Sequence, residues 1–185
     1  MNLFFYLLII LLFLIVIMFF SSSTLSPIPY FPSNKKDLPL IIKALSLKNN
    51  QTVFDLGAGD GIVIFEAAKK SFEKKLNTKF FAVEINPVLI LIMWSKWLFH
   101  PNRKNIKIVR DNIFTMNFKK LVTKPVISNQ QSATFYLYIS PWYLEKVIEN
   151  CKLKIENYKI VSYFYSVPKM RAKKVFEGKN KIFIY

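Results

Sequence analysis

Hydrophobic positions are distributed very differently in the first 20 residues and in the rest of the chain. Residues 3–20 form an unbroken apolar and aromatic run without a helix breaker, and the first charged residue is Lys35. A run of this length is sufficient for a helix that spans a bilayer. A cleaved signal peptide is the alternative, and Ser21-Ser22-Ser23 would give it a poor cleavage site, but the basic residues that normally precede its apolar core are absent. We therefore expect residues 1–20 to be an uncleaved transmembrane anchor.

After residue 36, short apolar runs alternate with longer amphipathic stretches. We expect Asp37 to cap the first helix, with Pro39 in its first turn. Residues 118–132 lack periodicity and are expected to form a loop. The pattern predicts strands at 53–56, 79–84, 106–114, 133–139 and 159–165, helices at 37–47, 62–70, 87–99 and 141–150, and a closing hairpin at 175–185 around Gly178. This alternation predicts an α/β fold built on a parallel sheet.

Two further segments of this pattern are the helix at 87–99 and the stretch before the domain. The helix at 87–99 is apolar almost all round, so it is either buried against the sheet or lies on a bilayer surface. Residues 21–36 contain serines and then three prolines around Tyr30 and Phe31, which favours a stiff, extended linker. The chain therefore divides into an anchor (1–20), a linker (21–36) and one folded domain (37–185).

A glycine-rich turn follows the first strand of that domain. Gly57, Gly59 and Gly61 are three of only four glycines in the chain, and Asp55 and Asp60 flank them. Dinucleotide-binding turns have the spacing G-x-G-x-x-G, whereas this turn has G-x-G-x-G. The two carboxylates would repel a pyrophosphate but suit a ligand with a cationic amino-acid end, such as S-adenosylmethionine.

This turn resembles the first motif of the class I S-adenosylmethionine-dependent methyltransferases. The resemblance implies a Rossmann-like seven-stranded methyltransferase sheet with its last strand antiparallel, and S-adenosylmethionine as cofactor. It also implies that Glu84, at the end of the second strand, binds the ribose, and that Asp111, at the end of the third, contacts the adenine amino group. The cofactor-binding residues expected on this basis are Asp55, Gly57, Ala58, Gly59, Asp60, Gly61, Glu84, Ile85, Asp111 and Asn112.

A second resemblance rests on Pro29-Tyr30-Phe31-Pro32-Ser33 and Glu84-Ile85-Asn86-Pro87. Together with the anchor and the first motif, these segments resemble a family of membrane-anchored protein-lysine methyltransferases, typified by the enzymes that modify the c-ring protein of ATP synthase, and their bacterial relatives. Where that family often has Gly-Arg-Ile, this chain has Gly61-Ile62-Val63. The resemblance implies a membrane-associated protein substrate and an acceptor channel that includes Tyr30, Tyr138, Ser140, Pro141 and Trp142.

Two other functions stay open at this point. Nucleic-acid amino-methyltransferases carry Asp/Asn/Ser-Pro-Pro-aromatic after the fourth strand, and Ser140-Pro141-Trp142-Tyr143 differs in its third residue. A non-catalytic membrane protein that retains the fold is the other alternative.

The charge balance and the inventory of reactive side chains limit these functions further. The net charge is +16, from 27 basic and 11 acidic residues that all follow the apolar run. Such a surface attracts polyanions: anionic lipid head groups if the anchor is present, or nucleic acid, although a lysine-rich composition also results from an AT-rich genome. With a single cysteine, Cys151, and a single histidine, His100, we expect no disulfide and no metal site. Basic residues follow the anchor and none precedes it, which predicts a single-pass protein whose domain faces the cytoplasm.

Overall fold

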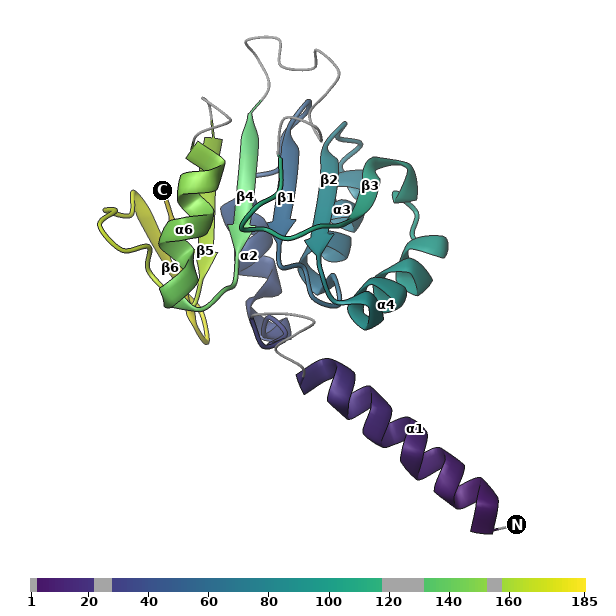
Figure 1. Ribbon diagram of the computed structural model, residues 1–185. Coiled ribbons are helices and arrows are strands. Elements are labelled where there is room, and N and C mark those ends of the chain that lie inside the picture. The colour runs from purple at the N-terminus through teal and green to yellow at the C-terminus, as the bar shows by residue number, and fades with distance from the viewer. Residues whose placement is uncertain (1–2, 22–27, 118–131, 153–157) are drawn as a thin grey trace.

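The computed structural model describes residues 3–21, 28–117, 132–152 and 158–185, in which one mixed sheet is covered by helices on both faces (Figure 1). The strands are β1 (Thr52–Leu56), β2 (Lys79–Glu84), β3 (Ile106–Arg110), β4 (Ala133–Leu137), β5 (Tyr158–Tyr163), β6 (Lys174–Glu177) and β7 (Lys181–Ile184). The helices are α1 (Leu3–Ser21), α2 (Leu38–Leu45), α3 (Ile62–Glu73), α4 (Pro87–Leu98) and α6 (Pro141–Lys152), with short 3-10 turns η1 (Lys35–Asp37) and η2 (Arg103–Asn105).

The seven strands lie in the order β3-β2-β1-β4-β5-β7-β6. Strands β1 to β5 pair in parallel, and β7 pairs antiparallel with both β5 and β6. The predicted seven-stranded Rossmann-like sheet with an antiparallel last strand is therefore confirmed. The carboxyl ends of β1 to β5 consequently meet at one edge, here called the carboxyl edge, where ligands bind in open α/β sheets.

Alternating side chains of the strands build one core on each face of the sheet. Val53 and Phe80 pack in the core under α2, α3 and α4, while their neighbours Phe54 and Phe81 pack in the core under α6. The Phe54 ring stacks between Phe81 and Phe135, with ring centroids 5.1 and 5.2 Å away. Strands buried on both faces occur in the sequence as short continuous apolar runs, and for this reason they could be predicted from the sequence.

The first helix of the domain differs from the prediction. It covers residues 38–45 rather than 37–47, with Pro39 in its first turn as expected, and the Asp37 side chain makes no capping hydrogen bond. The Asp37 carboxylate instead accepts hydrogen bonds from Tyr163 Oη (2.7 Å) and from the backbone N–H groups of Lys179 (2.7 Å) and Asn180 (3.0 Å). Burial opposes ionisation of Asp37, but these hydrogen bonds outweigh it and lower the pKa of the carboxyl. Asp37 therefore lies at the predicted cap position, but its carboxylate binds the turn between β6 and β7 instead of the first turn of α2.

Helix α4 is buried on one side only. Leu89, Ile90 and Met93 are buried, whereas Leu91 and Trp94 on the opposite side are 68% and 43% exposed. The apolar sequence of this helix therefore reflects one face in the core and one face at the surface. The loop expected at 118–132 lies almost wholly outside the described residues.

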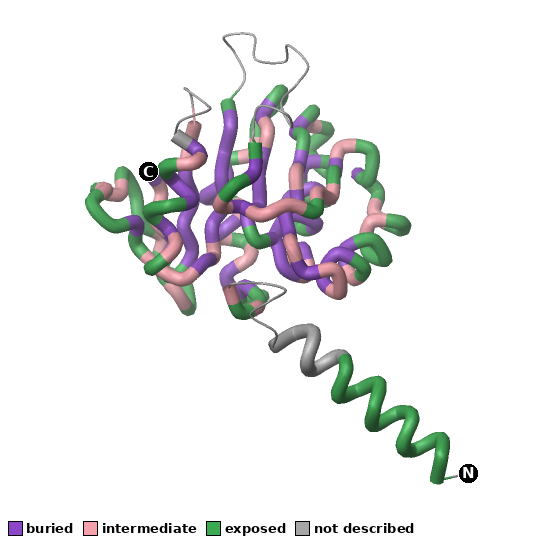
Figure 2. Tube along the Cα trace, in the orientation of Figure 1, coloured by how far each residue is buried: buried purple, intermediate pink, exposed green. Residues whose placement is uncertain are grey.

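Helix α1 extends away from the domain, and every residue from 3 to 15 is exposed (Figures 1 and 2). Among the residues that the structure describes, no helix meets both the length and the hydropathy that a membrane span requires. The predicted transmembrane helix is thus not confirmed.

Candidate active site

The glycine turn after β1 is fixed against the end of β2. The backbone N–H groups of Gly57 and Ala58 both donate to the carbonyl oxygen of Val83, each over 2.9 Å. Gly57, Gly59 and Gly61 have φ values of +77°, +59° and +77°, a region that residues other than glycine rarely adopt. The turn could be predicted from the sequence because this backbone conformation requires glycine, and three glycines lie close together here.

The glycines at 59 and 61 meet different neighbours. A Cβ added at Gly59 would lie 2.7 Å from the ring of Tyr30, so the segment before α2 crosses directly over the turn. A Cβ at Gly61 would instead lie 2.6 Å from the Phe65 ring and 3.0 Å from Met93. Gly59 therefore allows a close approach at the site, whereas Gly61 allows α3 and α4 to pack together.

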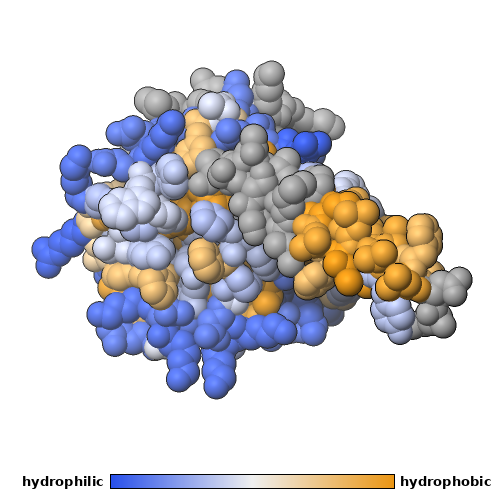
Figure 3. Space-filling model, turned by 60° about the horizontal axis from the view of Figure 1, so that its bottom comes forward, coloured by the Kyte–Doolittle hydropathy of each residue, from blue (hydrophilic) through white to orange (hydrophobic). Residues whose placement is uncertain are grey.

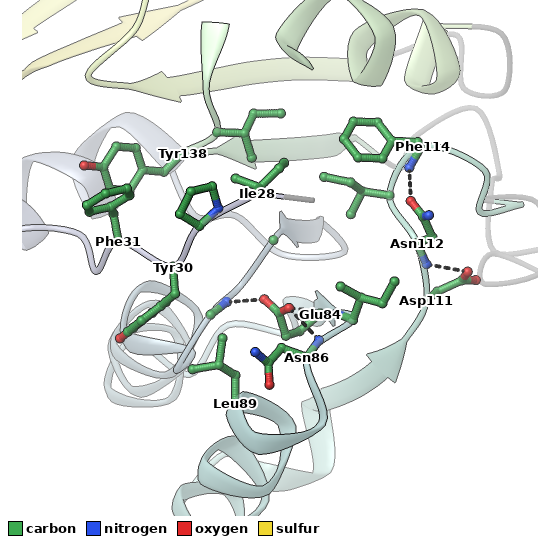
Figure 4. Close-up of a pocket in the computed structure, with 16 residues that line it drawn as sticks. Ile28, Tyr30, Phe31, Glu84, Asn86, Leu89, Asp111, Asn112, Phe114 and Tyr138 are labelled. Carbon is green, nitrogen blue, oxygen red and sulfur yellow. Dashed lines mark hydrogen bonds between the residues drawn. The ribbon is translucent and has the colours of Figure 1, made fainter. Parts of the chain in front are cut away.

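Glu84 holds this turn in place through both of its carboxylate oxygens (Figure 4). Its Oε2 accepts a hydrogen bond from Gly59 N (2.9 Å), and its Oε1 accepts from Ile85 N (2.8 Å) and Asn86 N (2.9 Å). A carboxylate has about four acceptor positions. One position is therefore left for a ligand hydroxyl, which is compatible with the predicted ribose contact but makes Glu84 chiefly a positioning residue for the glycine turn.

The end of β3 forms the opposite wall of the site. Asp111 N donates to the Glu84 carbonyl oxygen (3.2 Å), Asp111 Oδ1 accepts from Asn112 N (2.7 Å), and Asn112 Oδ1 accepts from Phe114 N (3.0 Å). These bonds fold the chain back at the carboxyl edge and leave the second Asp111 carboxylate oxygen outside this turn. Figure 4 shows Asp111, Asn112 and Phe114 along one side of the pocket.

One pocket brings together most of the predicted cofactor residues. Of the residues singled out from the sequence, it is lined by Tyr30, Gly57, Gly59, Glu84, Ile85, Asp111, Asn112 and Tyr138. The pocket has eight other lining residues for which no site role was predicted: Ile28, Pro29, Phe31, Asn86, Leu89, Ile113, Phe114 and Ile139. Seven of these eight are apolar, and Pro29, Phe31, Ile113 and Ile139 immediately follow or precede a residue predicted for the site. Their position next to predicted site residues could have identified them, because a purine needs apolar walls as well as polar contacts.

A smaller recess next to this pocket contains the remaining carboxylates. Asp55, Ala58 and Asp60 line it together with Tyr30 and Tyr138, among others. Burial, followed by the charges of Glu84 and Asp60, raises the pKa of Asp55 to about 8. The pKa of Tyr30 is raised to about 12, first by burial and then by the nearby Asp60, through its charge and a hydrogen bond.

After burial, the charges of Glu84 and Asp60 contribute to both shifts, so acidic side chains surround the recess. Lys96 Nζ contacts Asp60 Oδ2 (2.7 Å) on the outer side, whereas Asp55 is only 3% exposed. A ligand ammonium group placed here would stabilise the ionised form of Asp55. The donor set therefore fits the cationic amino-acid end of S-adenosylmethionine, and the pocket lined by Glu84 and Asp111 fits its nucleoside.

A third hollow lies beside the pocket and shares residues with it, and we call it the acceptor hollow. It is lined by Ile28, Pro29, Phe31, Tyr138, Ile139, Ser140, Trp142, Tyr143 and Tyr165. Of the residues predicted for the acceptor channel, Tyr138, Ser140 and Trp142 lie here, and Tyr30 lines the cofactor pocket instead. Pro141 lines none of these spaces and is the first residue of α6. Within the part of the chain that the structure describes, no group of three or more histidine, cysteine or acidic side chains is placed to hold a metal ion.

Comparisons with known proteins agree with this geometry. Residues 30–163 match the model of the ribosomal RNA adenine dimethylase family. A stretch of 93 residues is 30% identical to the lysine N-methyltransferase of the ATP synthase C protein from Caenorhabditis elegans and covers 47% of this chain and 46% of that enzyme. The chain thus spans about half the length of the curated relative it matches.

Solved structures with the same fold include enzymes with very different substrates. An RNA methyltransferase from Salinibacter ruber, in complex with S-adenosyl-L-homocysteine, has a TM-score of 0.64 at 16% identity, over 84% of this chain and 92% of that one. Precorrin-6y C5,15-methyltransferase from Geobacter metallireducens has a TM-score of 0.52 at 19% identity, over 83% and 91%. Both similarities show a shared fold and leave the substrate open.

Proposed function

From the premise that the chain belongs to the ribosomal RNA adenine dimethylase family, we propose that it methylates a lysine side chain of a membrane-associated protein. Its cofactor is S-adenosylmethionine. When bound, the cofactor supplies a methyl group on a positively charged sulfur, which needs only an aligned, unprotonated nucleophile.

The residues around the two spaces have separate tasks in this proposal. Glu84 holds the glycine turn and offers its remaining acceptor position to the ribose, while the second carboxylate oxygen of Asp111 accepts from the adenine amine. Asp55 binds the ammonium group in its ionised form. Tyr138 lines both the cofactor pocket and the acceptor hollow, so it forms the wall past which the acceptor amine reaches the methyl group.

The observation that carries the choice of lysine is the lining of the acceptor hollow. Its walls are aromatic, aliphatic and hydroxyl side chains, with no basic or acidic residue among the described lining residues. Such walls accommodate an aliphatic side chain, attract an ammonium group to the ring faces and favour its neutral form after burial. The similarity to a protein whose name specifies lysine N-methylation supports the same substrate class.

A second candidate is an RNA adenine methyltransferase. The ribosomal RNA substrate in the family's name and the net charge of +16 favour it. An aromatic residue, Tyr143, also lines the acceptor hollow, where a flipped base would stack. Against it, Trp142 replaces the second proline of the usual amino-methyltransferase motif.

A methylation assay on the full chain separates the two candidates. The purified protein is incubated with isotope-labelled S-adenosylmethionine and either membrane proteins or total RNA, and labelled residues are identified by mass spectrometry. We expect methyl-lysine in a membrane protein, with loss of label for Asp55→Ala and full label for Glu73→Gln, a change on the exposed side of α3. Label confined to RNA would exclude the lysine substrate.

We also propose that α1 attaches the protein to a membrane, with the domain on the cytoplasmic side and anionic lipids as partners. The supporting observation is that thirteen consecutive apolar or aromatic side chains, Leu3 to Ile15, are all exposed, between 39% and 75%. Water does not stabilise such a helix surface, whereas lipid does. Flotation with membrane vesicles and protease digestion of right-side-out vesicles test this proposal. A chain that stays in solution, or a domain that added protease cleaves, would contradict it.

A further inference from the structure

Three large aromatic side chains at the carboxyl edge are exposed. Phe31 is 67% exposed, Trp142 is 85% exposed and Phe164 is 45% exposed. Phe31 and Trp142 line the acceptor hollow, and the Phe164 ring lies 6.3 Å from the ring of Tyr138, which lines it too. We call Phe31, Trp142 and Phe164 the aromatic rim, because they lie around the hollow on segments distant in sequence.

The backbone at Phe164 is unusual in a way that concerns this surface. Its φ is +73°, a conformation that bulky residues rarely adopt. Its N–H group donates to the carbonyl oxygen of Lys181 over 2.8 Å, which holds the residue in that conformation. An aromatic side chain is therefore kept at the surface where a glycine would be less strained. One part of its ring packs against Tyr165, with ring centroids 4.6 Å apart, and 45% of the residue stays exposed.

The same edge is connected to α1 by a short stretch of chain. Ile28 lines both the cofactor pocket and the acceptor hollow, and α1 ends at Ser21. Seven residue steps reach at most about 25 Å, whatever their conformation. A membrane that holds α1 is therefore close to the mouth of the acceptor hollow. Figure 3 looks toward this edge, with the apolar α1 projecting from it at the right.

Basic side chains border the edge on the side of the β6–β7 turn. Lys35, Lys36 and Lys179 are exposed, and they adjoin one another because Asp37 accepts a hydrogen bond from Lys179 N. Figure 3 shows hydrophilic side chains along the border of this face. Exposed aromatic rings next to lysines match the interface of an anionic bilayer, where rings lie at the head-group level and lysines meet phosphates.

We propose that the aromatic rim docks on the surface of an anionic bilayer, so that the acceptor hollow opens directly onto the membrane interface. This proposal rests on the membrane attachment proposed above and adds a second, specific contact. The acceptor amine would then enter the hollow from the head-group region. A lysine held at that depth would be favoured over one in a freely soluble protein.

Tryptophan fluorescence tests the docking without interference from α1. All three tryptophans, Trp94, Trp97 and Trp142, lie in the domain, and α1 contains none. The full chain is mixed with phosphatidylcholine–phosphatidylglycerol vesicles whose acyl chains carry bromine near the head group. Bromine quenches only tryptophans that touch the bilayer, so the measurement needs neither cofactor nor substrate.

We expect Trp142→Phe to reduce the quenched intensity at least twofold, whereas the matched control Trp94→Phe on α4 leaves it near the wild-type value. The double variant Phe31→Ser/Phe164→Ser should also reduce quenching at least twofold while the chain still sediments with vesicles. A chain that sediments but whose Trp142 is unquenched would overturn the docking surface and leave the attachment by α1 intact. A chain that does not sediment would overturn both, and neither result bears on methyl transfer itself.

Discussion

Ionisation of Asp55 should control cofactor binding in neutral solution. Burial and the nearby charges of Glu84 and Asp60 raise the pKa of Asp55 to about 8, so the ligand-free protein holds a proton there at neutral pH. A bound ammonium group requires the ionised carboxylate, and binding must therefore release that proton. With a pKa of about 8, about nine in ten Asp55 side chains are protonated at pH 7.

The magnitude follows from this fraction. Below the pKa, affinity should rise about tenfold for each unit of pH, or about 1.4 kcal/mol, over the range from about pH 6 to pH 7. S-adenosylhomocysteine is a suitable ligand, since it carries the same amino-acid end and is not consumed. Calorimetry in buffers of different ionisation enthalpy should detect the release of about 0.9 proton at pH 7.

Two variants sharpen this measurement. Asp55→Asn should bind more weakly and show no dependence on pH in this range, whereas Glu73→Gln should keep the wild-type slope. A flat affinity profile for the wild type, with no proton released, would refute the assignment of Asp55 to the ammonium group.

The same shift predicts how the stability of the ligand-free protein depends on pH. Because the folded pKa of Asp55 lies above its ordinary value of 3.8, its contribution to stability is fully present below that value and is lost as pH rises through about 8. The melting temperature of the wild type should therefore fall, relative to that of Asp55→Asn, as pH rises from about 4 to about 8, and the difference should stay constant above that range. Parallel curves for the two proteins would contradict the buried, protonated state.

Further substitutions test the contacts that position the site. Gly59→Ala should lower the free energy of unfolding by about 1–2 kcal/mol, because its φ of +59° is unfavourable for alanine, and should weaken S-adenosylhomocysteine binding at least tenfold by calorimetry. Asp37→Ala should lower the free energy of unfolding in urea by about 2 kcal/mol, since Lys179 N loses a charged acceptor. Because the pKa of Asp37 is lowered, this difference should be present above the unfolded value and vanish as pH falls through the folded pKa. Ser33→Ala should cost about 1 kcal/mol by leaving the buried Tyr136 hydroxyl without its 2.8 Å partner, and adding Tyr136→Phe should cost little more.

The order of elements and the position of the glycine turn could be predicted from the sequence alone. Strands buried on both faces are continuous apolar runs, and the helices between them have amphipathic patterns. Local periodicity therefore predicted that strands alternate with helices, and this alternation implies a parallel sheet. The left-handed turn required glycine at positions 57 and 59, and acidic residues at three strand ends marked the carboxyl edge. These features depend on neighbours within a few residues, which is why a single sequence reveals them.

Contacts between distant segments were decided only by the tertiary structure. Asp37 bonds to Tyr163, 126 residues away, rather than capping its own helix. Glu84 uses most of its acceptor positions on backbone N–H groups, and Tyr30 packs over Gly59 because the strand order brings their segments together. Exposure of Phe31, Trp142 and Phe164 is likewise invisible in the sequence, where an aromatic residue ordinarily indicates a core. Periodicity encodes which side of an element is apolar, but only the packed sheet determines what, if anything, covers that side.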